Sequence, residues 1–131
     1  VMTAMGESSL QNLDYGDWET SGVANPDGSR TTSIGLFQQQ DGWGTRDERL
    51  DPYTAATLFY RAMIARVPDR EALPPTTVAH RTQVNRDPEH YAPYWPLAEA
   101  LVASAYLSAP VRAGAPSRGS ADGRSAPAAA S

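Results

Sequence analysis

The sequence predicts a mainly α-helical domain that carries one long Gly/Asp-rich loop or short hairpin. Three features of the 131 residues support this prediction. The first is an amphipathic segment at 51–67, the second is helical spacing of apolar residues on both sides of it, and the third is a run of turn-forming residues at 14–32. Apolar residues that recur every three or four positions mark a helix with one buried face. The length suits a single domain.

Residues 1 to about 13 form the first predicted helix, because Met2, Met5, Leu10 and Leu13 are spaced for one face. Glu7 lies on this segment with a mixed environment of polar and apolar neighbours. Since the chain begins inside the helix, we expect the N-terminus to be truncated and residues that precede it to be missing.

Residues 14–32 contain an Asn-Pro-Asp-Gly run, so we expect a loop or a short hairpin with little regular structure. Residues 33–40 read Ser-Ile-Gly-Leu-Phe-Gln-Gln-Gln, where Gly35 permits a close backbone approach. A second glycine-rich turn at 41–45 carries Trp43, and a short helix is expected at 46–49.

The clearest helix spans 51–67, with Asp51 as its cap and Pro52 in its first turn. Pro68 ends it, and residues 70–73 are expected to form one more turn. The predicted buried stripe of this helix consists of Ala56, Phe59, Tyr60, Met63, Ile64 and Val67.

Residues 76–85 form a further predicted helix, capped by Thr76 or Thr77. Another helical segment is expected to start at 87–89, to be split by Pro93 and Pro96, and to continue to about Leu107. Its predicted buried face consists of Tyr91, Tyr94, Trp95, Ala98, Leu101, Val102 and Ala105.

The folded domain is therefore expected to span 1–108. In 109–131, 18 of 23 residues are Ala, Pro, Gly or Ser, which predicts a disordered tail.

The composition excludes several classes of protein. A net charge of −4 argues against a nucleic-acid partner, and the absence of cysteine excludes disulfides and thiol catalysis. His80 and His90 have no cysteine partner, so we expect no metal site and no cofactor. No apolar run approaches the roughly 18 residues that a membrane-spanning helix needs.

Two motifs together indicate a function. Gly6-Glu7-Ser8 on an apolar helical segment, followed by the Ser-x-Gly-Leu-Phe-Gln run at 33–38, resembles the soluble lytic transglycosylases and goose-type lysozymes. This resemblance implies a lysozyme-like fold in which Glu7 is the catalytic acid and the 33–40 turn lines the sugar cleft. Residues 12–17, 41–45 and 88–92, with Trp95, also look like the transglycosylase-like domains of actinobacterial cell-wall proteins.

Cleavage of a glycosidic bond needs a carboxylic acid that stays protonated near neutral pH, so desolvation of Glu7 is expected to raise its pKa. Family members carry a Tyr-Asn motif in the cleft, for which Gln83 and Asn85 are approximate replacements here. The candidate substrate-binding residues are Ser8, Ser33, Gly35, Gln38, Gln39, Trp43, Tyr15, Gln83 and Asn85.

The type of reaction depends on a second carboxylate. A hydrolase needs one near the first, whereas a lytic transglycosylase uses the substrate's own groups and forms a 1,6-anhydro end. Asp17 is the best second candidate, ahead of three other loop acids, Asp14, Glu19 and Asp27. Loop acids beside glycine are usually turn formers, so we expect a lytic transglycosylase that cleaves the MurNAc-GlcNAc β-1,4 bond.

Two alternatives remain open. One is a lysozyme-type muramidase that uses a loop carboxylate, and the other is a non-catalytic glycan-binding module of a larger wall or phage-tail protein. All three readings predict peptidoglycan glycan strands as the partner, and a monomer located outside the cell or in the cell envelope.

Overall fold

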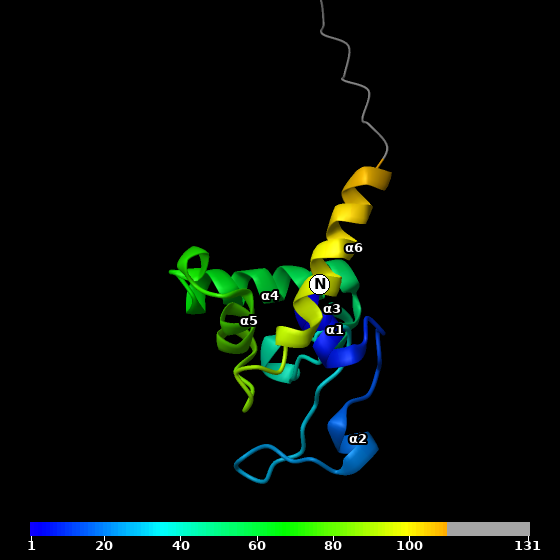
Figure 1. Ribbon diagram of the computed structural model, residues 1–131. Helices are drawn as coiled ribbons and strands as arrows, with labels where there is room; N and C mark the ends of the chain where they lie inside the picture. Colours follow the sequence, from blue (N-terminus) through cyan, green and yellow to red (C-terminus); the bar gives the residue numbers. More distant parts are fainter. Residues whose placement is uncertain (110–131) are drawn as a thin grey trace, which may run out of the picture.

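The computed structural model describes residues 1–109, which form a mainly α-helical body (Figure 1). Within this range there is no β-strand, and only two isolated bridges occur, Ala24–Arg30 and Ile34–Gln39. The predicted mainly α class is therefore confirmed. The α-helices are α1 (Met2–Ser8), α2 (Asp17–Ser21), α3 (Arg46–Leu50), α4 (Pro52–Arg66), α5 (Pro75–Gln83) and α6 (Trp95–Ser108). The 3-10 helices are η1 (Asp41–Trp43), η2 (Arg70–Ala72) and η3 (Ala92–Tyr94).

Helix α1 is shorter than the sequence predicts, because it ends at Ser8 and not near residue 13. Ser9 and Leu10 both adopt left-handed backbone angles, with φ of 54° and 61°, so the chain leaves the helix there. Leu10 is 42% exposed, and its helical spacing from Met5 therefore does not reflect a buried face. The consequence is that Glu7 lies in the last turn of α1.

The 14–32 loop contains more regular structure than expected, because α2 lies inside it. The backbone N–H of Gly16 donates a hydrogen bond of 3.0 Å to Glu19, a contact that stabilises the first turn of this helix. In the second half of the loop, Ala24 and Arg30 form an isolated antiparallel bridge across a turn, which makes a short hairpin without β-strands. In Figure 1, α2 and this hairpin lie at one end of the molecule, away from α4 and α5.

Helix α4 forms as the sequence predicts. Its N-cap Asp51 accepts a hydrogen bond of 2.8 Å from the N–H of Thr54, and Pro52 occupies the first position. Phe59 stacks on Phe37 with ring centroids 5.1 Å apart, in a cluster that also contains Ala4 and Ala55.

Only part of the predicted α4 stripe is buried. Tyr60 and Ile64 are 55% and 57% exposed, so the expectation that they belong to the core is wrong. Phe59 and Val67 of the same stripe are buried.

The 33–40 turn is held between α3 and α4. Gly35 has φ of +79°, and a Cβ atom on it would lie 2.2 Å from the carbonyl oxygen of Arg49, so only glycine fits. The buried Arg49 side chain donates hydrogen bonds of 2.8 Å and 3.0 Å to the carbonyls of Thr32 and Gln39. The turn is thereby fixed against the body of the domain.

The C-terminal third differs from the prediction in its boundaries. Helix α5 begins at Pro75 after Pro74, without a threonine cap. Residues 88–91 form turns, and a helix does not begin there; Asp87 accepts a hydrogen bond of 2.9 Å from the N–H of Glu89. The chain then enters η3 and α6 directly.

Helix α6 packs only through its first turns. Ala98 and Tyr91 are buried in a cluster with Met2 and Ala79, whereas the rest of α6 extends away from the body (Figure 1). The predicted buried face of α6 is therefore wrong for three of its large residues. Trp95, Leu101 and Val102 are 39%, 45% and 42% exposed.

Among residues 1–109, no helix is both long and apolar enough to cross a membrane. The predicted tail at 109–131 lies outside the described residues, apart from Ala109.

Candidate active site

Glu7 and Tyr91 form the centre of the candidate site. Glu7 is half-buried at the end of α1, and the hydroxyl of Tyr91 donates a hydrogen bond to its Oε1. The Tyr91 side chain has no exposed surface, so its ring is fixed by the surrounding core. The carboxyl group is thus held by a rigid partner, while Glu7 as a whole remains only half-buried.

Gly6 makes this contact possible. A Cβ atom on Gly6 would lie 2.7 Å from Cδ1 of Tyr91, which is closer than carbon atoms approach each other without displacement. The absence of a side chain at position 6 therefore lets the tyrosine ring pass against α1 and reach Glu7. The Gly-Glu pair of the sequence motif therefore has a simple physical meaning: glycine leaves the space through which Tyr91 reaches the glutamate.

Gln83 and Asn85 lie at the end of α5, beside the same two residues. The Gln83 amide faces both Glu7 and the hydroxyl of Tyr91, and its Nε2 also donates a hydrogen bond of 2.8 Å to the carbonyl of Phe37. The Asn85 side chain also approaches the Tyr91 hydroxyl. The structure therefore brings both residues together with Glu7.

Burial raises the pKa of Glu7 above its ordinary value of 4.5, and the charge of Asp17 adds to this increase. The hydrogen bond from Tyr91, the charge of His90 and the Gln83 amide each act in the opposite direction. Burial and the neighbouring carboxylate raise the pKa of Tyr91, which keeps its hydroxyl protonated as a donor. The net result is a carboxyl group with a raised pKa and defined partners, which suits a general acid.

Asp17 begins α2 and is exposed to solvent, and it is near enough to influence the pKa of Glu7. The residues around it converge on the same place. The Gln38 amide donates hydrogen bonds to the carbonyls of Tyr15, at 3.2 Å, and Gly35, at 3.1 Å. A Cβ atom on Gly16 would lie 2.4 Å from the carbonyl oxygen of Ser33. The backbone beside Asp17 thus packs against the turn that carries Ser33 and Gln38.

Three other candidates support the backbone in this structure. Ser8 is buried, and its hydroxyl proton is shared between the Leu36 carbonyl, at 2.8 Å, and the Ala4 carbonyl, at 3.1 Å. Gln39 is only 1% exposed, and its amide donates a hydrogen bond of 3.0 Å to the carbonyl of Ala55. Gly35 packs against Arg49, as described above. Both the Ser8 hydroxyl and the Gln39 amide are therefore turned toward the interior of the protein.

Trp43 lies on the α4 side of the molecule. The guanidinium group of Arg66 is 5.0 Å from the centre of its ring, in a cation–π arrangement. Arg66 also donates a hydrogen bond to the carbonyl of Thr82, the residue before Gln83. Trp43 is therefore linked through Arg66 to the end of α5 and has no direct contact with Glu7.

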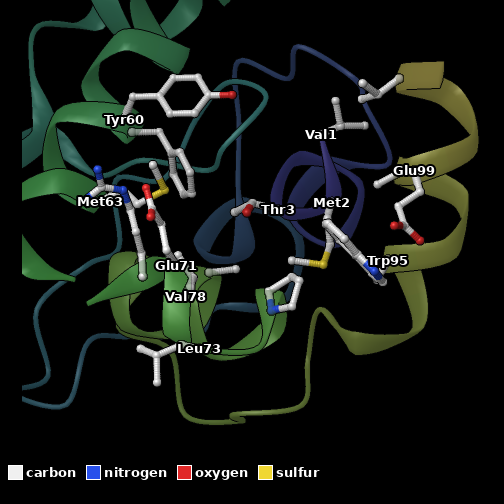
Figure 2. Close-up of a pocket in the computed structure, with 16 residues that line it drawn as sticks. Val1, Met2, Thr3, Tyr60, Met63, Glu71, Leu73, Val78, Trp95 and Glu99 are labelled. Carbon is white, nitrogen blue, oxygen red and sulfur yellow. The ribbon is translucent and has the colours of Figure 1, made fainter. Parts of the chain in front are cut away.

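Two cavities lie apart from Glu7. One, of about 510 Å³, has mainly apolar walls from α1, α4, α5 and α6, and it opens beside Val1, Met2 and Thr3 at the opposite end of α1 (Figure 2). The other, of about 330 Å³, lies beside α2 and α3 and is lined by both acidic and arginine side chains. Glu7 lines neither cavity. Within residues 1–109, no group of three or more His, Asp or Glu side chains is arranged to hold a metal ion.

Two residues of the site are not among the candidates that the sequence suggests. The apolar pattern predicts only that Tyr91 is buried, and His90 is of interest in the sequence only as a metal ligand, yet both contact the end of α1. The Pro-x-x-Tyr-Ala run at 88–92 belongs to the resemblance described above and marks this segment, but it does not indicate that Tyr91 contacts Glu7.

Comparison of the chain with protein-family models, with curated proteins and with solved structures yields no significant match.

Proposed function

We propose that this protein is a lytic transglycosylase of peptidoglycan, which cleaves the MurNAc-GlcNAc β-1,4 bond with Glu7 as general acid and then general base. One observation supports this proposal most strongly: Glu7 is a half-buried carboxyl group with a raised pKa, and Tyr91 holds it in place. The Glu7 and 33–40 motifs that resemble this enzyme group also lie against each other, through the hydrogen bond from Ser8 to Leu36.

The reaction has two steps at Glu7. The protonated carboxyl group gives its proton to the glycosidic oxygen as the bond from that oxygen to C1 of MurNAc breaks. The 6-hydroxyl group of the same MurNAc then attacks C1, and its proton passes to the Glu7 carboxylate. The product has a 1,6-anhydro end, Glu7 is protonated again, and no water is consumed.

The surrounding side chains have separate roles in this proposal. Gln38, Gln83 and Asn85 provide amide groups that can hydrogen-bond to N-acetyl and hydroxyl groups of the glycan. Tyr15, which is 42% exposed, provides an aromatic face on the Asp17 side of Glu7. A cell-envelope location follows from the substrate and belongs to the same proposal.

Hydrolysis is the second candidate, because Asp17 lies within electrostatic reach of Glu7 and is exposed. In a hydrolase, the second carboxylate acts as the nucleophile or activates a water molecule. A lysozyme-type reaction of this kind would produce reducing ends in place of anhydro ends.

The test is digestion of purified peptidoglycan by the wild-type chain, by Glu7→Gln and by Glu99→Gln, followed by mass spectrometry of the released fragments. Glu99 is the matched control because it is an exposed glutamate on α6. We expect wild type and Glu99→Gln to release fragments lighter than reducing-end fragments by one water. Glu7→Gln should lose about 100- to 10,000-fold in rate.

Two results would contradict the proposal. Reducing ends from the wild-type chain would establish hydrolysis and direct attention to Asp17. No products from a folded wild-type chain that still sediments with peptidoglycan would establish a glycan-binding module.

A further inference from the structure

We propose that His90 is a positioning residue for Glu7, acting through the carbonyl of Gly6 while Tyr91 holds the Glu7 carboxyl itself. This inference concerns the same site as the proposed function, and only its activity readout rests on that function.

The first observation is the way in which α1 ends. The last carbonyl groups of any helix lack partners within it and need other donors. In α1, the carbonyl of Met5 accepts a hydrogen bond from the N–H of Ser9, and that of Ser8 accepts one from the N–H of Gln11, both at 3.0 Å. The carbonyl of Gly6 accepts its hydrogen bond from Nε2 of His90, at 3.1 Å. His90 thus satisfies the carbonyl group directly before Glu7.

The second observation is that two consecutive residues of the 87–94 segment contact two consecutive residues of α1. His90 contacts Gly6 and Tyr91 contacts Glu7, each across 84 positions of the chain. The rings of His90 and Tyr91 pack edge to face, with centroids 4.9 Å apart and an angle of 72° between their planes. The two rings therefore contact the final turn of α1 as one packed unit. A displacement of the His90 ring is expected to displace the Tyr91 ring as well.

The third observation is that His90 is exposed and belongs to neither core cluster, although it contacts the site. Its replacement therefore leaves the apolar core in place. The charged and titratable groups that face Glu7 are His90 and Tyr91 from the 87–94 segment and Asp17 from α2, while α5 contributes the neutral Gln83. Among these groups, His90 alone also bonds to the backbone of α1.

Small displacements of a catalytic group are costly, because an error of about 1 Å can reduce a rate by roughly 100-fold. A loosened end of α1 would move the Glu7 carboxyl group relative to the glycosidic oxygen without changing the groups that bind the sugars. Loss of the His90 donor is therefore expected to lower kcat by about 10-fold and to leave KM unchanged.

The experiment compares His90→Phe, which keeps an aromatic edge but has no donor, with His90→Gln, which keeps an N–H donor. Arg86→Ala, at an exposed position of the same segment, is the control. The first readout needs no activity: carbon NMR follows the Glu7 carboxyl group and Cζ of Tyr91 during a pH titration. In the wild type, in His90→Gln and in Arg86→Ala, the Tyr91 signal should follow the ionisation of Glu7, whereas in His90→Phe this coupling should weaken.

The second readout is peptidoglycan turnover. His90→Phe should lose about 10-fold in kcat, and His90→Gln should recover most of it at unchanged KM. If His90→Phe retains both the NMR coupling and the wild-type kcat, the inference is wrong. If the wild type does not cleave peptidoglycan, the proposed function fails, and the NMR titration alone decides the role of His90. Should His90→Phe not fold, His90→Ala also lacks the donor and replaces it.

Discussion

The hydroxyl of Tyr91 donates a hydrogen bond to Oε1 of Glu7, although the two residues lie 84 positions apart in the chain. The contact joins the first helix to the segment before the last one, and it places a polar group at the edge of an apolar cluster. Burial raises the pKa of Glu7, and this hydrogen bond limits the increase. Four predictions concern these opposing effects on the pKa of Glu7 and the packing of Tyr91 against α1.

Replacement of Glu7 by Gln should stabilise the protein more at high pH than at low pH. The pKa of Glu7 in the folded state is raised above its ordinary value of 4.5, so the folded protein binds this proton more tightly than the unfolded chain does. The resulting stability is present below about pH 4.5 and is lost as the pH rises through the folded pKa. Because Gln cannot ionise, Glu7→Gln escapes this loss.

Urea denaturation at about pH 4 and about pH 8 measures the effect, with Glu99→Gln as the control for the removal of one exposed charge. If Glu7→Gln gains no more stability at the higher pH than the control does, the burial of Glu7 has no energetic consequence.

Tyr91→Phe should raise the pKa of Glu7 further, because the hydrogen bond that lowers it is lost while the buried ring is kept. In the proposed reaction, the free enzyme must carry a protonated Glu7, so kcat/KM declines as the pH rises through the pKa of this group. The decline should therefore move to higher pH in Tyr91→Phe. The variant should also lose about 1 to 3 kcal/mol of stability when Glu7 is ionised.

A pH profile of kcat/KM and urea denaturation test this prediction. Tyr94→Phe is the control, since it removes a hydroxyl group from a residue packed on the same cluster. A decline that stays at the wild-type pH would show that Tyr91 does not tune Glu7.

Asp17→Asn should have the opposite effect on the pH profile. The charge of Asp17 raises the pKa of Glu7, so its removal should shift the decline of kcat/KM to lower pH. Anhydro products should persist, because the proposed reaction needs only one carboxyl group. Asp14→Asn, at another exposed loop position, is the control. Abolished turnover in Asp17→Asn alone would identify Asp17 as the second carboxylate of a hydrolase.

Gly6→Ala should destabilise the protein and reduce its activity, although alanine favours helices by about 1 kcal/mol over glycine. The new Cβ atom would lie 2.7 Å from the Tyr91 ring, and such overpacking costs about 1–3 kcal/mol. Gly42→Ala is the control, because a Cβ atom there meets no other atom within 4 Å. Thermal unfolding and turnover distinguish the two variants. A stabilised Gly6→Ala would contradict the close approach of Tyr91 to α1.

The sequence predicts the local features of this fold well. Helix α4 begins at Pro52 after the Asp51 cap, and the mainly α class follows from such signals. Boundaries that depend on tertiary contacts were not predictable. Met5 and Leu10 have helical spacing, but the chain turns at Ser9 in order to reach the next element. Likewise, Leu101 has helical spacing on α6 and yet remains 45% exposed, because nothing within residues 1–109 covers it fully.

The candidate site was partly predictable, because some of its residues belong to local sequence motifs and others depend on tertiary contacts. Glu7, Gln83 and Asn85 could be proposed from their motifs, and the structure places them together. Tyr91 could not be assigned to Glu7, because an apolar pattern does not reveal where the hydroxyl group of a buried tyrosine points. The sequence also did not predict that the Ser8 and Gln39 side chains point into the protein, because it does not show which polar side chains form hydrogen bonds with the backbone.

The distance along the chain between Glu7 and Tyr91 also has a consequence for biosynthesis. A helix of only seven residues, such as α1, has little stability by itself, so Glu7 has no fixed position until the 87–94 segment packs on it. A chain that is still emerging from the ribosome presents Glu7 early but has no tyrosine to hold it. The pair of Glu7 and Tyr91 therefore forms only after residue 91 has been made, and a copy that terminates before it would lack this contact.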